Sequence, residues 1–155
     1  MDALNIAHEY DTVQFIVIKI GEEQFGIDIK YIDNIVRMTK ITRVPSVQPY
    51  FKGVINLRGE VVPVMSIRIK MGLADDVYTN DSRIIIIKME NNAPIGIIVD
   101  EVKEVVTLDE RFIEEVSRDS SRGDDCSFIN GIGKNGDNLI SLLELSTVIS
   151  EKETN

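Results

Sequence analysis

The residue types that most often carry out catalysis or hold metals are scarce in this sequence. His8 is the only histidine and Cys126 is the only cysteine among the 155 residues. A cysteine nucleophile needs a base beside it, and the single imidazole lies far from Cys126 along the chain. A zinc site of the usual kind needs four ligands, which one histidine and one cysteine cannot supply. We therefore interpret His8 as an exposed tail residue and Cys126 as a passive thiol, and we predict no catalytic residue and no metal site.

An acidic stretch towards the C-terminal end is the remaining candidate for an enzymatic site. It holds Asp119, Asp124 and Asp125 beside Cys126. The spacing of these carboxylates differs from that of a calcium-binding loop, and a solvated loop is the simplest interpretation. A small hydrolase that uses residues 119–126 stays open as an alternative, which an activity assay of Cys126→Ala would reveal.

Charge and aromatic content argue against a nucleic-acid partner, and no phosphate-binding loop indicates a nucleotide cofactor. The 17 Lys and Arg against 26 Asp and Glu give a net charge of −9 and an isoelectric point near 4.6, whereas phosphate binding needs clustered cations. There is no Trp and only 6% of residues are aromatic, which leaves little for base stacking. Gly131-Ile132-Gly133 lacks the third glycine and the following helix of a dinucleotide fingerprint. We expect no cofactor.

The composition favours a β protein. The sequence has 24 Ile and 16 Val but only 8 Leu, and branching at Cβ suits a pleated strand. Short apolar segments alternate with turn residues, a pattern that is typical of an all-β barrel or a pair of barrels with about ten strands. The expected strands are residues 13–20, 24–29, 37–44, 53–57, 61–65, 83–89, 94–106, 128–133 and 138–143.

Several expected elements have specific features. Residues 84–87 are four consecutive isoleucines, which predicts a strand buried on both faces. The three-residue spacing of Ile32 and Ile35 predicts a helical turn near residues 31–35. Asn135-Gly136 predicts a tight hairpin. Further short helical segments are expected within residues 67–73, 107–116 and 145–149.

The chain is expected to form one domain of two small halves. Residues 1–12 and 151–155 are polar and are predicted to be flexible tails, with the domain at residues 13–150. Residues 74–82 mark the approximate division, although halves too small for separate cores can exchange strands. The absence of a signal-peptide pattern, the single cysteine and the short apolar runs predict a cytoplasmic protein.

One region carries a specific signature, Gly53-Val54-Ile55-Asn56-Leu57-Arg58-Gly59 followed by Val62-Pro63-Val64 and Ile67-Arg68. It closely resembles the signature of the CheW family of bacterial chemotaxis coupling proteins. Ser66 departs from the family, which often has an acidic residue before the Ile/Leu-Arg pair. Three weaker blocks agree in order and spacing, so the resemblance covers nearly the whole chain. They are Phe25-Gly26-Ile27-Asp28-Ile29, Gly96-Ile97-Ile98-Val99-Asp100-Glu101-Val102 and Phe128-Ile129-Asn130-Gly131-Ile132-Gly133.

The resemblance implies an all-β fold of two packed five-stranded SH3-like barrels with short helical segments. It also implies a non-catalytic adaptor that couples the cytoplasmic tips of methyl-accepting chemotaxis receptors to the regulatory domain of the histidine kinase CheA. Such an adaptor is a monomer alone, joins the kinase in rings, and is recruited by receptors to the inner face of the membrane without inserting into it. A coupling scaffold of a related non-motility array stays open as an alternative.

The resemblance further implies receptor-binding residues in two places. Ile32 and Ile35 are expected to line a groove between the barrels, with burial in the core as the alternative. Asn56 and Leu57, at the end of the strand expected over residues 53–57, and Arg58, in the turn that follows it, form the second group. Arg58 would contact a carboxylate or a carbonyl on the receptor, and the Asn56 side chain would shape the turn by a local hydrogen bond.

The kinase-binding surface is expected on the first barrel, beside the signature. The resemblance implies that it contains Ile41, Arg43 and Val44. Ile41 and Val44 would form an apolar patch. A charge placed in this patch would weaken kinase binding, because it would lose its hydration at the interface.

Overall fold

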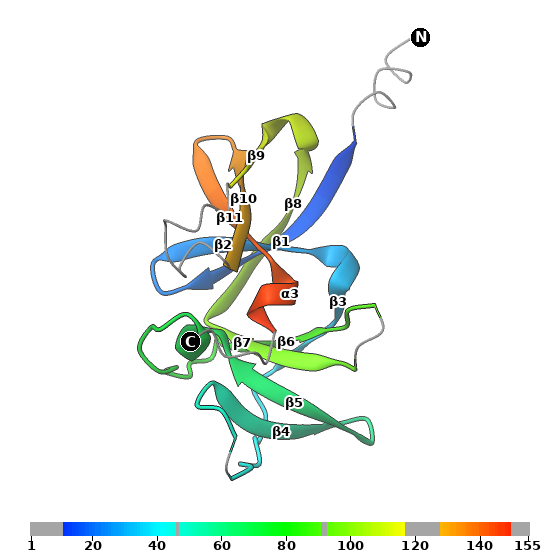
Figure 1. Cartoon of the computed structure of the whole chain (residues 1–155), viewed down its shortest axis with the longest axis vertical. Helices are drawn as coiled ribbons and strands as arrows, with labels where there is room; N and C mark the ends of the chain where they lie inside the picture. The colour runs from blue at the N-terminus through cyan, green and yellow to red at the C-terminus, as the bar shows by residue number, and fades with distance from the viewer. Residues whose placement is uncertain (1–10, 46, 91–92, 117–127, 150–155) are drawn as a thin grey trace.

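The computed structural model describes residues 11–45, 47–90, 93–116 and 128–149, and these form a mostly β protein with two sheets (Figure 1). The strands are β1 (Thr12–Ile20), β2 (Glu23–Asp28), β3 (Ile32–Arg37), β4 (Phe51–Leu57), β5 (Glu60–Ser66), β6 (Arg83–Ile87), β7 (Ile95–Val99), β8 (Glu101–Asp109), β9 (Ile113–Glu115), β10 (Ile129–Asn135) and β11 (Asn138–Leu143). The helical segments are η1 (Ile29–Tyr31), α2 (Ile67–Lys70), η2 (Glu110–Phe112) and α3 (Leu145–Val148).

The strands pair into one sheet of six and one of five. The six-stranded order is β8-β1-β2-β11-β10-β9, in the upper half of Figure 1, and the five-stranded order is β3-β6-β7-β5-β4, in the lower half. Paired strands are antiparallel except for β2–β11 and β5–β7, which are parallel. The five-stranded sheet curls back on itself, because Thr42, in the segment after edge strand β3, forms an isolated bridge with Val54 of the other edge strand, β4.

The two sheets are not formed by the two halves of the sequence. The chain enters the five-stranded sheet at β3 and leaves it after β7, so β1 and β2 lie in one sheet with β8–β11. The change of sheet occurs at η1 and at Asp100. Residues 74–82, where we expect the division, lie between β5 and β6, which belong to the same sheet.

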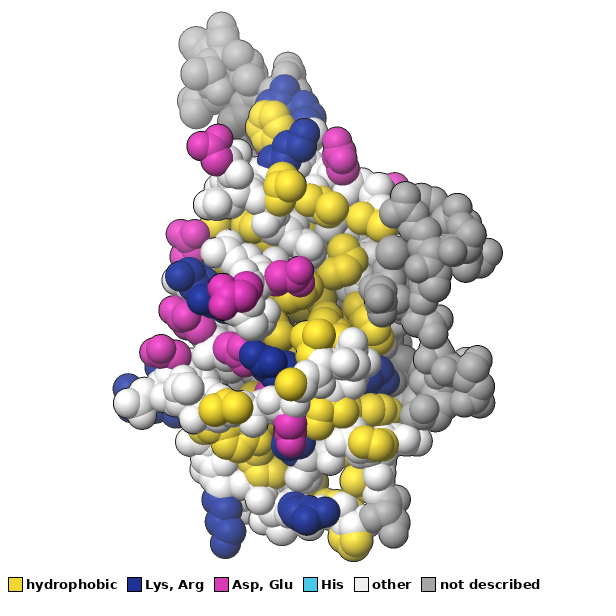
Figure 2. Space-filling model, turned by 90° about the vertical axis from the view of Figure 1, so that its left-hand side faces the viewer, with side chains coloured by type: hydrophobic (Ala, Val, Ile, Leu, Met, Phe, Trp, Pro, Cys, Tyr) yellow, Lys and Arg dark blue, Asp and Glu magenta, His cyan; other side chains and the backbone are white. Residues whose placement is uncertain are grey.

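Charge is distributed unevenly over the molecule. On the face shown in Figure 2, acidic side chains gather along one side of the middle. Basic side chains stand at the lower end, which the five-stranded sheet forms. In this view the acidic side chains of the chain, whose net charge is −9, are therefore concentrated away from the lower end.

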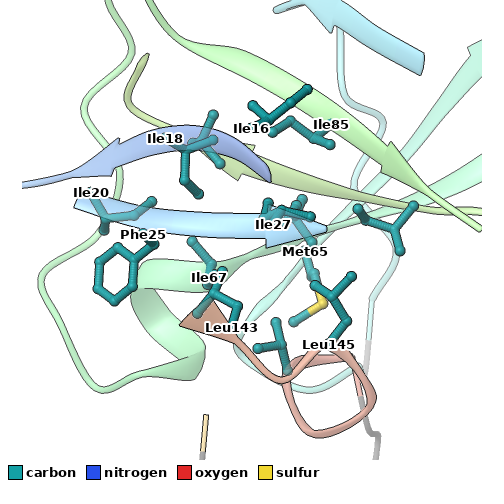
Figure 3. Packing of buried hydrophobic residues seen from close by; sticks show 14 of the residues in the cluster. Ile16, Ile18, Ile20, Phe25, Ile27, Met65, Ile67, Ile85, Leu143 and Leu145 are labelled. Atoms are coloured by element: carbon teal, nitrogen blue, oxygen red, sulfur yellow. The ribbon is translucent and has the colours of Figure 1, made fainter. Parts of the chain in front are cut away.

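The largest hydrophobic cluster, here called the inter-sheet core, lies between the two sheets (Figure 3). Successive side chains of a strand point to opposite faces of its sheet. On β1, Ile16, Ile18 and Ile20 therefore enter the inter-sheet core, while Phe15 and Val17 fill a second cluster with residues of β8 and β11. Figure 3 shows side chains of both sheets meeting in the inter-sheet core.

The isoleucines of β6 are divided between two clusters in the same way. Ile85 and Ile87 enter the inter-sheet core, whereas Ile84 and Ile86 fill a third cluster, here called the five-stranded core. None of the four side chains is more than 1% exposed. The predicted burial of this strand on both faces is confirmed.

The helical turn predicted near residues 31–35 is wrong, because this segment forms β3 and the turn precedes it as η1. The Asp28 side chain caps the start of η1, where its Oδ1 accepts a hydrogen bond from the backbone N–H of Lys30. A register shift between Ile32 and Asn34 in the pairing with β6 marks a β-bulge. The bulge lets Ile32 and Ile35 both pack against the inter-sheet core, so an irregular strand produces the spacing that resembles a helix.

Two expected strands also differ from the structure. The strand predicted over residues 37–44 is absent, because β3 ends at Arg37 and only Thr42 forms a bridge beyond it. The long strand predicted over residues 94–106 is broken at Asp100 into β7 and β8, which belong to different sheets. A single apolar pattern cannot show where a strand leaves one sheet for another.

The remaining local predictions are confirmed. The tight hairpin predicted at Asn135-Gly136 connects β10 and β11, with Asn135 paired to Asn138 and the turn formed by Gly136, whose φ is 65°, and Asp137. The helical segments expected within residues 67–73, 107–116 and 145–149 contain α2, η2 and α3. These features are determined by residues that are close together in the sequence, so a short stretch of sequence is enough to predict them.

Candidate binding surfaces

The signature region forms the hairpin of β4 and β5, and Arg58 and Gly59 form its turn. Both have positive φ, 54° for Arg58 and 87° for Gly59, as a two-residue type I′ turn requires. The Oδ1 atom of Asn56 accepts a hydrogen bond from the Gly59 backbone N–H at 3.0 Å. The predicted shaping of the turn by Asn56 is therefore confirmed.

Arg58 occupies this turn under strain. It is the only non-glycine residue with positive φ among the described residues, and a type I′ turn favours Asn or Gly at this position. Its side chain is exposed and forms no hydrogen bond or ion pair with any described residue. The guanidinium is therefore free to meet a partner.

The five expected receptor-binding residues do not lie against one cluster. Ile32 and Ile35 are half-buried against the inter-sheet core, whereas Leu57 packs against the five-stranded core. Asn56 and Arg58 are exposed at the β4–β5 hairpin. The two groups lie on opposite edge strands of the five-stranded sheet, so a receptor would have to contact both edges to use all five.

Gly53 positions the segment that carries the expected kinase-binding residues. It lies inside β4 at a register shift, not in a turn, and its φ is 141°. A Cβ atom at this position would overlap the carbonyl oxygen of Thr42. Its absence lets Thr42 N donate to Val54 O at 2.8 Å and Val54 N donate to Thr42 O at 2.9 Å. Glycine at position 53 therefore holds residues 38–44 against β4.

A groove of about 770 Å³ lies between this segment, the start of β4 and the connector before β6; we call it the basic groove. Its main apolar lining residues are Met38, Ile41, Phe51 and Tyr78. Its charged lining residues are Lys40, Arg43, Lys52 and Asp75. Two of the expected kinase-binding residues, Ile41 and Arg43, therefore share one groove. Val44 is 38% exposed on the same segment but does not line the groove.

A second groove, of about 740 Å³, lies at the junction of the two sheets, and none of the expected receptor-binding residues lines it. Lys30, Tyr31 and Met89 line it from one side, and residues of β1, β9 and β11 line it from the other. Ile32 lines a smaller groove of about 350 Å³, which also has Lys30, Tyr31 and Met89 in its wall. Ile32 therefore lies beside the junction groove, while Ile35 lines neither groove.

An ion pair between Arg68 and Asp100 links the two parts of the fold that carry the two sheets. Both residues lie in the blocks that resemble the family, but the sequence alone does not show that they contact each other. Arg68 Nη2 lies 2.6 Å from Asp100 Oδ2, and Arg68 Nε lies 3.1 Å from Asp100 Oδ1. The Gly21 backbone N–H also donates to Asp100 Oδ2, at 2.7 Å. Asp100 stands where the chain changes sheet, so this network ties α2 to the β1–β2 turn.

The network also sets the charge state of Asp100. Burial would raise the pKa of this carboxyl, but the hydrogen bonds from Arg68 and Gly21 and the charges of Arg68 and Lys19 outweigh burial and hold the pKa below its ordinary value. The hydrogen bond with Asp100 is the main cause that raises the pKa of Arg68. Both groups are therefore charged at neutral pH.

Ser66, where the sequence departs from the family signature, has a polar contact of its own. Its Oγ accepts a hydrogen bond from Ile69 N at 3.1 Å, which caps α2, and donates to Asp76 Oδ2 at 2.5 Å. Burial raises the pKa of Asp76 despite this hydrogen bond. A carboxylate therefore reaches position 66 from the connector before β6.

The structure offers no metal centre within its described residues, where no group of three or more His, Cys, Asp or Glu side chains could hold an ion. In the same part of the chain, every helix is too short or too polar to cross a membrane. His8 and the stretch of residues 119–126, including Cys126, lie outside the described residues.

Comparisons with known proteins agree over most of the chain. The family model described as the CheW-like domain matches residues 14–153. The chain is 32% identical to "Chemotaxis protein CheW" of Helicobacter pylori, over 91% of this chain and 84% of that protein. It is 33% identical to the protein of the same name from Bacillus subtilis, over 91% and 89%.

A solved structure is also similar. It is the scaffolding protein TtCheW from Thermoanaerobacter tengcongensis, with a TM-score of 0.82 and 32% sequence identity. The match covers 93% of this chain and 98% of that one. The similarity therefore includes the arrangement of both sheets.

Proposed function

Because the chain belongs to the CheW-like domain family, it is a chemotaxis scaffold and not an enzyme, and we propose that it couples methyl-accepting chemotaxis receptors to the histidine kinase CheA. It does so in the cytoplasm, beneath the receptors, through a single domain at residues 13–150. The observation that carries the proposal is the presence of two chemically different surfaces on the five-stranded sheet. One is the β4–β5 turn with its free guanidinium, and the other is the segment of residues 38–44 with the basic groove.

The receptor binds at the β4–β5 turn in this proposal. Arg58 holds a strained conformation with an exposed side chain, and its planar group suits a carboxylate or a carbonyl at the end of a helical hairpin. Val61, which pairs with Asn56 across the hairpin, is 68% exposed and offers an apolar surface beside the arginine. Ile32 and Ile35 contact the receptor from the opposite edge strand.

Replacing Arg58 by alanine is expected to weaken binding to a receptor cytoplasmic fragment by about 1–3 kcal/mol, the range for a charge-assisted contact. Stability should change little, because Ala and Arg both tolerate a positive φ poorly. Arg58→Asn should also lose receptor binding, although Asn fits the turn better. Isothermal titration with the receptor fragment and with the kinase measures both effects.

The kinase provides the control for this experiment. Its affinity should be the same for both Arg58 variants and for the wild type, because its proposed surface is separate. An equal loss for the two partners would indicate a damaged fold. Unchanged receptor affinity would show that Arg58 serves only the turn.

The kinase binds along residues 38–44 in this proposal, through Ile41, Arg43 and Val44. Val44→Asp is expected to reduce kinase affinity by about 1–3 kcal/mol, because the new carboxylate would be desolvated at the interface. Leu139→Asp is the matched control, since Leu139 is an exposed apolar residue on the six-stranded sheet. Kinase binding is measured after thermal melting has shown that both variants fold. A folded Val44→Asp variant with wild-type affinity would move the kinase site elsewhere.

A further inference from the structure

We propose that the basic groove binds an acidic, amphipathic segment of the kinase, in which an apolar side chain lies between carboxylates. This inference rests on the proposed function and adds the chemistry of the partner to it. The groove contains Ile41 and Arg43, but its remaining walls come from the start of β4 and from the connector before β6. It is therefore a larger site than the expected kinase-binding residues alone.

The floor of the groove is apolar and firmly supported. Met38 and Ile41 pack against the five-stranded core, and Phe51 packs against the inter-sheet core. Tyr78 is 47% exposed in the opposite wall. A volume of about 770 Å³ is in the range of clefts that bury a ligand of several side chains. The floor can therefore accept an apolar side chain without rearranging the fold.

The rim of the groove has the opposite charge to the rest of the protein. Lys40, Arg43 and Lys52 face it with one carboxylate, Asp75, so the lining carries a net charge of +2. The whole chain carries −9, and Figure 2 shows acidic side chains over the middle of the face drawn there. An acidic segment is repelled by the net charge of the chain and attracted to this rim, which directs it to the groove.

Asp75 marks the position that a partner carboxylate would take. Its Oδ1 lies 2.8 Å from Lys52 Nζ. The Asp75 side chain is 62% exposed, whereas the Lys52 side chain is only 21% exposed. A displaced Asp75 can return to water, while the less exposed side chain of Lys52 stays in the groove. An incoming carboxylate can therefore replace Asp75 on Lys52.

The test is a titration of the full-length cognate kinase into variants of the full chain at several salt concentrations. Lys40→Glu and Arg43→Glu should each weaken binding by about tenfold at low salt and less at high salt. Lys103→Glu, the matched control on β8, should bind like the wild type. Asp75→Asn should bind several-fold more tightly, because Lys52 no longer has an internal carboxylate to release.

Asp75→Asn is a sensitive arm of this test, because damage to the fold would not produce tighter binding. The Oδ1 of Asp75 also accepts the backbone N–H of Asp76 at 2.7 Å, and the amide oxygen of asparagine can keep that bond. A gain in affinity for Asp75→Asn together with losses for Lys40→Glu and Arg43→Glu would support an acidic segment. Wild-type affinity for all three variants would overturn it.

Failure of this inference differs from failure of the proposed function. If the kinase does not bind the wild-type chain, the proposed function fails. If it binds, and Val44→Asp weakens binding while Lys40→Glu and Asp75→Asn leave the affinity unchanged, the proposed function stands and the acidic segment is wrong. If Lys40→Glu and Arg43→Glu instead abolish self-association of this chain in analytical ultracentrifugation with kinase binding intact, a second copy occupies the groove and the inference is wrong.

Discussion

Replacing Gly53 by alanine is expected to destabilise the protein by about 3–4 kcal/mol, a loss at the high end for a single substitution. The new Cβ would overlap Thr42 O, and it would lie 2.7 Å from Thr42 C and 3.0 Å from Ile41 Cγ2. Backbone atoms held by two hydrogen bonds cannot move aside without breaking the Thr42–Val54 bridge. Urea unfolding at neutral pH measures the loss.

Gly72→Ala separates this steric effect from backbone strain. Gly72 also has a positive φ, 80°, but no atom lies within 4 Å of the place its Cβ would take. This substitution should cost only about 1 kcal/mol, the penalty for a positive φ alone. If Gly53→Ala lowers the free energy of unfolding no more than Gly72→Ala does, the segment of residues 38–44 can move away from the new Cβ atom at little cost.

The same substitution should affect one partner more than the other. Residues 38–44 carry Ile41, Arg43 and Val44 and form one wall of the basic groove. A folded fraction of Gly53→Ala, studied at low temperature, should therefore bind the kinase more weakly than the wild type. Receptor binding through Arg58 should change less, because the turn lies at the far end of the hairpin.

The parts of the fold that could be predicted depend on neighbours in the sequence. Four isoleucines in a row determine the burial of β6 on both faces, and Asn135-Gly136 determines a hairpin. The spacing of Ile32 and Ile35 misled because a β-bulge and a helix can both place residues three apart on one side. Only the pairing of β3 with β6 distinguishes the two.

The order of the strands in the two sheets could not be predicted from the sequence, because it depends on pairs that are distant in the chain. The parallel pairs β2–β11 and β5–β7 join segments that are far apart in the chain, and no local pattern specifies such pairs. The change of sheet at Asp100 has the same character, because a charged residue inside a long apolar pattern can also be a surface position of a single strand.

The candidate surfaces divide along the same line. The turn at Arg58 and the hydrogen bond from Gly59 N to Asn56 Oδ1 lie within four residues, so both could be predicted from the sequence. The basic groove combines Lys40 and Arg43 with Lys52 and with Asp75, which come from three separate stretches of the chain. Its charge could not be recognised before the fold had brought those stretches together.

Breaking the link between Arg68 and Asp100 is expected to cost about 2–3 kcal/mol at neutral pH, because either partner would be left partly buried without its counter-charge. The Arg68 and Asp100 side chains are 19% and 26% exposed, so water screens the pair only in part. Arg68→Ala and Asp100→Asn should each show this loss in urea unfolding. The double variant should lose less than the sum, because both single changes remove the same interaction. Additive losses would show that the two side chains act independently.

The pH dependence of these variants provides a second test. The pKa of Asp100 lies below its ordinary value in the folded state, because the hydrogen bonds and charges around it outweigh its burial. A carboxyl with a lowered pKa stabilises the fold fully above its unfolded pKa, and this contribution is lost as the pH falls through the folded pKa. The wild type should therefore exceed Asp100→Asn in stability at pH 7, and the difference should shrink below about pH 4.

Asp76→Asn is the control for this pH dependence, because its trend has the opposite sign. Burial raises the pKa of Asp76 above its ordinary value, so the wild-type carboxyl becomes less favourable to folding as the pH rises through that range. The stability of the wild type relative to Asp76→Asn should therefore decrease from pH 3 to pH 7, while its stability relative to Asp100→Asn increases. Parallel trends for the two variants would mean that acid destabilises the protein as a whole. The ion pair between Arg68 and Asp100 would then not be the cause of the pH dependence.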